Sequence, residues 1–91
     1  MKIAVVIPSY KVKQQINIVL KKIPSFVDKV YVIDDGCPEG SGEAVLNENL
    51  SDKITVIFHK LNLGVGAAVK TGFIQAIKDG NEIIVNLDGD G

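Results

Sequence analysis

Two pairs of aspartates in this sequence have the residue type and spacing of a metal or ligand site. Asp34 and Asp35 are adjacent and precede a glycine, and Asp88 and Asp90 flank Gly89 near the end of the chain. Carboxylates held within a few ångströms repel one another, and a hard divalent cation such as Mg²⁺ or Mn²⁺ relieves that repulsion through the oxygen ligands it prefers. Asp-Gly pairs are also common in turns, so each pair alone fits either a turn or a site.

A glycine-rich segment and an aromatic residue are further candidates. The segment GVGAAVKTG begins at Gly64 and would open a helix, whose first backbone N–H groups suit a phosphate. It matches neither the dinucleotide-binding fingerprint nor the P-loop, and its small residues could equally serve close helix packing. Pro8 and Tyr10 follow the first apolar run, where Tyr10 could stack on a flat base or belong to a plain turn. His59 closes a later apolar run and is expected to be only a strand-end residue.

The elements that must position these residues follow from the hydrophobic pattern. The run KIAVVIP is rich in β-branched residues, which is typical of a strand covered on both faces. Strands are predicted over residues 2–8, 29–34, 53–58 and 81–88, and helices over residues 12–23, 42–50 and 65–79. This order predicts an α/β fold with right-handed crossovers: a Rossmann-like parallel sheet of about four strands with helices on both faces.

A parallel sheet brings the carboxyl ends of its strands to a single edge. The segments that follow the predicted strands are PSY, DDG, HKLNLGVG and LDGDG. The candidate residues therefore converge at one edge although they lie far apart in the sequence. That convergence favours a binding site over a set of unrelated turns.

Composition limits the classes of function. The chain has 91 residues, 46% of them hydrophobic and 23% charged, which predicts one soluble globular domain over residues 1–91. The net charge is −1 and the lysines are dispersed, so we expect no nucleic-acid partner. Cys37 is the only cysteine, which favours a reducing, cytoplasmic setting. No apolar run is long enough to span a membrane, and we expect neither a signal peptide nor an anchor.

Four segments of the chain together resemble a known family. VVIPSYK, VIDDGCPEGS, NLGVGAAVKTGF and VNLDGDG, in this order and spacing, are similar to the N-terminal half of the family 2 inverting glycosyltransferases of the GT-A fold. The similarity is to the branch that includes the dolichyl- and polyprenyl-phosphate sugar synthases. It extends over the whole chain and implies a truncated GT-A fold that carries the sugar-nucleotide-binding part.

For the nucleoside, the resemblance implies contacts from three segments. Pro8 and Tyr10 would line the nucleobase pocket. Asp35, with Asp34 nearby, would contact the base or the ribose, and the loop at Gly64 would border the nucleotide.

For the diphosphate, the resemblance implies that Asp88 and Asp90 are the D-x-D motif, which binds Mg²⁺ or Mn²⁺ against the diphosphate of a UDP- or GDP-sugar. The metal would neutralise charge on the departing nucleoside diphosphate while an acceptor attacks the anomeric carbon. The acceptor would be polyprenyl phosphate or a saccharide hydroxyl. In the family, the acceptor surface and the base follow the D-x-D. No residue of this chain is therefore assigned a catalytic role, and the chain alone is expected not to transfer sugar.

Two other classes of function were compared with this one. A non-catalytic nucleotide-binding or assembly module of the same fold is the alternative interpretation. A phosphoryl-accepting receiver domain is disfavoured, because its third aspartate would follow the third strand, which here ends in FHKLN. The last predicted strand would lack a covering neighbour, so we also expect self-association through an exposed edge or face.

Overall fold

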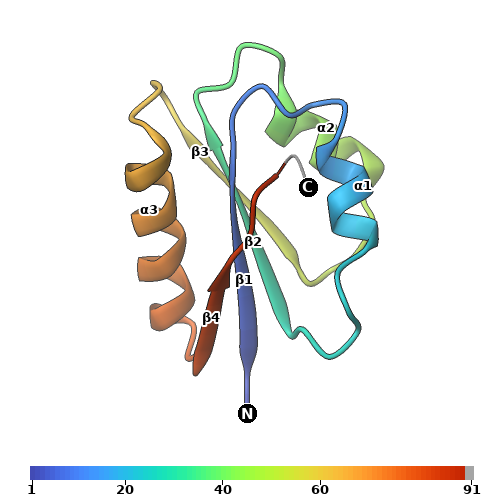
Figure 1. Cartoon of the computed structure of the whole chain (residues 1–91), viewed down its shortest axis with the longest axis vertical. Coiled ribbons are helices and arrows are strands. Elements are labelled where there is room, and N and C mark those ends of the chain that lie inside the picture. Colours follow the sequence, from blue (N-terminus) through green and yellow to red (C-terminus); the bar gives the residue numbers. More distant parts are fainter. Residues whose placement is uncertain (90–91) are drawn as a thin grey trace.

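The computed structural model describes residues 1–89, and its elements follow the predicted alternation of strand and helix. The strands are β1 (Ile3–Ser9), β2 (Lys29–Asp35), β3 (Ile54–His59) and β4 (Ile83–Asn86), and the helices are α1 (Ile16–Lys21), α2 (Ser41–Glu48) and α3 (Val65–Lys78). All neighbouring strands pair in parallel, in the order β3-β2-β1-β4. Figure 1 shows α3 on one face of this sheet and α1 and α2 on the other, so the predicted architecture is confirmed. No helix within residues 1–89 has the length and apolar character of a membrane span.

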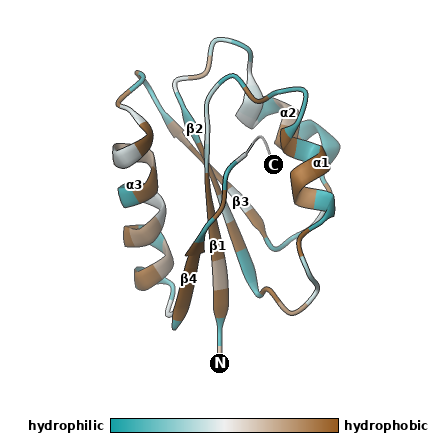
Figure 2. Ribbon diagram, viewed as in Figure 1, coloured by the Kyte–Doolittle hydropathy of each residue, from teal (hydrophilic) through white to brown (hydrophobic). Residues whose placement is uncertain are grey.

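Side chains along each strand alternate between the two faces of the sheet, and each face has its own core. Val5 and Ile7 of β1 face α1 and α2, whereas Ala4 and Val6 face α3. The core beneath α1 and α2 contains Val5, Ile7, Ile16, Val19, Leu20, Val27, Val30, Val32 and Val45, and the core beneath α3 contains Ala4, Val6, Tyr31, Ile33, Ala68 and Ala76. In Figure 2 the brown, hydrophobic colour follows the strands.

α3 packs directly on the sheet through small residues. Its buried residues are Ala68, Gly72 and Ala76. A Cβ atom at Gly72 would overlap the side chain of Val6 in β1 and lie 3.1 Å from Ile33 in β2, so glycine is what permits this close approach. The sequence pattern predicts a broader apolar stripe, which is wrong at its ends, because Val65 and Ile77 are 68% and 63% exposed.

Some element boundaries differ from the predicted ones. α1 begins at Ile16 rather than Val12, and residues 13–15 form a turn in which the Gln15 and Ile16 N–H groups both donate to the Val12 carbonyl (3.0 and 2.8 Å). Leu46, expected on the apolar side of α2, is 56% exposed. β4 is shorter than the predicted range 81–88, because its ladder with β1 ends at the Val6–Asn86 pair.

β4 lies at one edge of the sheet, and the face of β4 toward α1 is incompletely covered. The parallel register pairs Val85 with Val5, so these two side chains share the α1 face. Val85 remains 46% exposed and Leu87 39% exposed. Both residues line an apolar cavity of about 530 Å³, whose other walls include Ile18 and Val19 of α1. The exposed apolar face is therefore centred on β4.

The close approach of α3 to the sheet gives a matched pair of substitutions. Gly72→Ala should destabilise the protein by about 1–3 kcal/mol, because the new methyl group overlaps Val6 in a packed core. Gly66→Ala, in the same helix, adds a methyl group with nothing within 4 Å and should be neutral or stabilising by up to about 1 kcal/mol, since alanine favours the helix. Urea unfolding of both variants measures the difference. Equal effects at the two positions would contradict the packing argument.

Candidate functional site

A cavity of about 520 Å³ lies at the carboxyl edge of the sheet, beside the start of α3. It is lined by Pro8, Ser9, Tyr10, Val12, Asp35, Asn62, Gly64, Val65, Ala68, Asp88 and Gly89. The structure thus brings together five of the predicted site residues, which are Pro8, Tyr10, Asp35, Gly64 and Asp88. No binding role was predicted for the other lining residues. They join the wall because the segments after β1, β3 and β4 and the start of α3 meet there.

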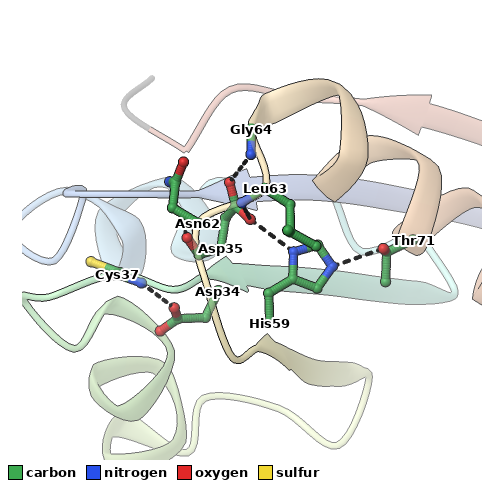
Figure 3. Close-up of polar contacts among 8 residues, drawn as sticks. All are labelled: Asp34, Asp35, Cys37, His59, Asn62, Leu63, Gly64 and Thr71. Carbon is green, nitrogen blue, oxygen red and sulfur yellow. Dashed lines mark hydrogen bonds and ion pairs between the residues drawn. The ribbon is translucent and has the colours of Figure 1, made fainter.

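The two adjacent aspartates at the end of β2 point to opposite faces of the sheet (Figure 3). Side chains of successive strand residues point to alternate faces, so Asp34 lies on the face toward α1 and α2, and Asp35 lies on the face toward α3. Both are nearly inaccessible, at 3% and 2% exposure. Buried carboxylates need hydrogen-bond donors, and each aspartate finds its donors in a different loop.

Asp34 holds the start of α2. Its Oδ1 accepts from the Cys37 N–H and its Oδ2 from the Gly42 N–H, both at 2.8 Å. The N-cap residue Gly40 has no side chain, so the Asp34 carboxylate caps the helix instead. Asp34 does not line the cavity. This geometry supports a structural role for Asp34 and gives no contact through which it would reach the predicted nucleotide.

Asp35 lines the cavity and holds the loop before α3. Its Oδ1 accepts from the Leu63 N–H (3.0 Å) and from His59 Nδ1 (2.8 Å), and its Oδ2 accepts from the Gly64 N–H (2.9 Å). Its backbone carbonyl accepts from Asn62 Nδ2 (3.1 Å). Burial by itself raises the pKa of Asp35, but the hydrogen bonds from His59, Leu63 and Gly64 outweigh it and hold the pKa below the ordinary value of an aspartate. The carboxylate is therefore charged at neutral pH.

His59 is more than a strand-end residue, so that expectation is wrong. Its side chain is only 10% exposed and lies between Asp35 and α3. Its Nδ1 bonds Asp35 Oδ1, and its Nε2 lies 2.8 Å from Thr71 Oγ1. The strand register could have revealed this contact from the sequence. β2 and β3 pair Asp35 directly with His59, and both side chains lie on the face toward α3.

The loop that carries Tyr10 is tied to the loop after β2. Lys11 has a positive φ of 56°, and its N–H donates to Cys37 Sγ (3.2 Å), which also lies 3.0 Å from Ser41 Oγ. Burial by itself raises the pKa of the Cys37 thiol, but the hydrogen bonds from Ser41 and Lys11 outweigh it and lower the pKa. Tyr10 is 41% exposed, and Lys11 Nζ lies 5.5 Å from its ring centroid. The ring is thus open to a stacking ligand beside a cation.

The start of α3 already holds a carboxylate of the protein. The N–H groups of Leu63 and Gly64, just before the helix, both donate to Asp35. The helix dipole favours negative charge at this position, and Asp35 supplies it. A phosphate at the same place would be repelled by Asp35. The phosphate hypothesis for the glycine-rich segment therefore loses support, and Gly64 remains as part of the cavity wall.

Asp88 lies at the cavity and is exposed to solvent. Its predicted partner Asp90 lies outside the described residues. Within residues 1–89, no group of three or more His, Cys, Asp or Glu side chains has the arrangement of a metal site. Asp88 nonetheless fits a Mg²⁺ or Mn²⁺ site of the usual kind, in which one or two carboxylates act together with substrate phosphates. The assignment of metal ligands stays a prediction.

Comparison with known proteins identifies the family of this chain. Residues 4–91 match the family model described as Glycosyl transferase family 2. The polyprenol monophosphomannose synthase of Mycolicibacterium smegmatis is 29% identical over 96% of this chain and 34% of that protein. The undecaprenyl-phosphate mannosyltransferase of Micrococcus luteus is 27% identical over 100% of this chain and 39% of that protein. The chain thus spans between a third and two fifths of the length of these relatives.

A solved structure agrees with both the fold and the family. The mannosyltransferase of Pyrobaculum calidifontis, in complex with GDP-Man and Mn²⁺, superposes with a TM-score of 0.86 and 25% sequence identity. The superposition covers 98% of this chain and 27% of that one. Because the family model matches nearly every residue, the chain belongs to glycosyl transferase family 2, with the Rossmann-like α/β sheet of the GT-A glycosyltransferases.

Proposed function

We propose that this chain is the donor-binding part of a glycosyltransferase and binds a nucleoside-diphosphate sugar in the cavity beside α3. The observation that carries the proposal is the convergence of Pro8, Tyr10, Asp35, Gly64 and Asp88 on that one cavity. These residues come from the carboxyl ends of β1 and β2 and from the segments that follow β1, β3 and β4. An exposed aromatic ring, a charged acceptor and an exposed carboxylate are the groups that a base, a nucleoside and a metal-bound diphosphate require.

The charge of the cavity supports a requirement for a divalent cation. Among the described lining residues, Asp35 and Asp88 are acidic and none is lysine or arginine. A diphosphate would therefore be repelled unless a cation accompanied it. Asp88, together with Asp90, would hold Mg²⁺ or Mn²⁺, and the bound ion would neutralise charge on the leaving diphosphate. Tyr10 would stack on the base and Asp35 would accept a hydrogen bond from the nucleoside.

The relatives favour one donor for the first experiments. Both curated relatives are named for transfer of mannose, and the superposed structure contains GDP-Man and Mn²⁺. GDP-mannose is therefore the first donor to test, with UDP-sugars as the second. Both relatives are also named for a polyprenyl phosphate, which makes that the first acceptor. A phosphate acceptor is already ionised and needs no base to remove a proton.

The transfer reaction is proposed for a protein that carries this chain together with the rest of the length of its relatives. The chain by itself, at 91 residues, would bind the donor without transferring its sugar. The reducing, cytoplasmic setting predicted from the single cysteine belongs to the same proposal.

The first prediction concerns nucleotide binding. Calorimetry should show weak binding of GDP or UDP that depends on Mn²⁺. Asp88→Asn should weaken binding about tenfold, because a neutral amide is a poorer ligand for a hard cation. Asp52→Asn is the matched control, since Asp52 is also exposed but does not line the cavity. Absence of metal-linked binding at millimolar nucleotide would contradict the proposed function.

The second prediction concerns transfer. Given GDP-mannose or UDP-sugars, Mn²⁺ and polyprenyl phosphate, the chain alone should release no nucleoside diphosphate beyond the rate without protein. A form extended through the remaining length of the relatives should turn over. Turnover by the chain alone would refute its assignment as a donor-binding part. Nucleotide binding without turnover by the extended form would favour a non-catalytic module.

The third prediction concerns the uncovered face of β4, through which we propose that the chain self-associates. Val85→Lys places a charge in the apolar cavity that Val85 lines and should weaken a dimer at least about tenfold. Leu46→Lys is the matched control, because Leu46 is exposed on α2 and does not line that cavity. Sedimentation over a range of concentrations measures the dimer. A monomer at every concentration, or equal effects of the two variants, would contradict this surface.

A further inference from the structure

We infer that His59 is a positioning residue which, with Thr71, limits Asp35 to accepting one hydrogen bond from the bound nucleoside. This inference rests on the proposed function and specifies how that site recognises its ligand. It follows from the contacts of Asp35, His59 and Thr71, which come from β2, β3 and α3.

The acceptor positions of Asp35 can be counted. A carboxylate offers roughly four lone-pair sites. Three are used inside the protein: Oδ1 accepts from His59 Nδ1 and from the Leu63 N–H, and Oδ2 accepts from the Gly64 N–H. One position on Oδ2 is left. The side chain is only 3% exposed, so little of it is open to a second donor.

The imidazole of His59 keeps this arrangement fixed. Its Nδ1 must carry the hydrogen, because the Asp35 carboxylate can only accept. In the neutral ring, Nε2 is then the acceptor, and the Thr71 hydroxyl at 2.8 Å donates to it. The ring is thus bonded at both nitrogens, and Asp35 Oδ1 is not free to turn toward a ligand.

One open position selects the kind of donor. The imide N–H of uracil is a single donor, and so is each hydroxyl of the ribose. The Watson–Crick edge of guanine instead presents an N–H and an adjacent amino group, which together need two acceptors. Asp35 can satisfy a single donor but not that pair. If the nucleotide is GDP, we therefore expect Asp35 to contact a ribose hydroxyl or one N–H only.

A comparison of GDP with inosine diphosphate tests this limit, since the latter lacks only the amino group of guanine. Calorimetry with Mn²⁺ should give affinities within about threefold of each other. A preference for GDP of about tenfold or more that disappears in Asp35→Ala would overturn the inference, because Asp35 would then read both donors. A preference that persists in Asp35→Ala comes from another residue and agrees with the inference. Melting temperatures establish that the variant is folded.

Nucleotide analogues test whether His59 acts through Asp35. The 2′-deoxy and 3′-deoxy nucleotides each lack one ribose hydroxyl, and 3-methyl-UDP and 1-methyl-GDP lack the base N–H. One of these changes should weaken binding about tenfold, which is the expected loss of a bond to a charged acceptor. His59→Asn keeps a donor near the position of Nδ1 and should retain the tenfold ratio between the dissociation constants of the analogue and the parent nucleotide. His59→Leu removes the donor, so the Asp35 carboxylate is free to turn and its open position is no longer fixed toward the nucleoside; the ratio should fall to less than about threefold.

The outcomes separate positioning from simple stabilisation. If His59→Leu weakens parent and analogue equally, its role is structural only and the inference is overturned. If no analogue loses affinity in the unaltered chain, Asp35 accepts no hydrogen bond from the nucleoside. The inference and the role proposed for Asp35 then fail, while metal-dependent binding of the donor stands. If no nucleotide binds at all, both fail. Thr71→Val should also reduce the ratio, as His59→Leu does. Thr55→Val is the control, because Thr55 lies on the same face of β3 as His59, and it should leave the ratio unchanged.

Discussion

The alternation of side chains along β2 is the constraint on which the rest of the structure depends. It sends two adjacent carboxylates to opposite faces of the sheet, where Asp34 binds the backbone at the start of α2 and Asp35 binds the backbone just before α3. Each carboxylate is buried, and each accepts hydrogen bonds from backbone N–H groups in the loop before a helix or in the first turn of that helix. The pair therefore anchors one helix of each layer to the end of a single central strand.

Packing in the middle of the sheet determines how the edge is shaped. α3 can lie close to β1 and β2 because the residues of α3 that face the sheet, Ala68, Gly72 and Ala76, are small. This close approach brings Thr71 within reach of His59 and places Ala68 in the cavity wall. A bulkier helix face would move the helix start away from the end of β1. The stability of the layer and the dimensions of the cavity at the carboxyl edge thus have one cause.

The polar groups of the cavity are few because the protein uses most of them itself. Two backbone N–H groups and an imidazole that could have bound a ligand are taken up by Asp35. Among the described lining residues, what remains is acidic or neutral. These lining residues offer no cation to a diphosphate, which is why the proposed nucleotide binding would require a divalent metal ion. The superposed mannosyltransferase of Pyrobaculum calidifontis contains GDP-Man together with Mn²⁺.

The sequence by itself determined the fold class and the edge at which the candidate site lies, because strand and helix periods are local and a parallel sheet necessarily gathers its strand ends at one edge. That convergence brought Tyr10, Asp35 and Asp88 together, and the family resemblance added Pro8 and Gly64; their roles stay predictions. Tertiary structure alone decided what Asp34 and His59 do, since their partners lie in other elements and depend on strand register and helix placement. It also decided which apolar residues stay exposed. Val85 is 46% exposed, because β4 is an edge strand and α1 does not cover its face.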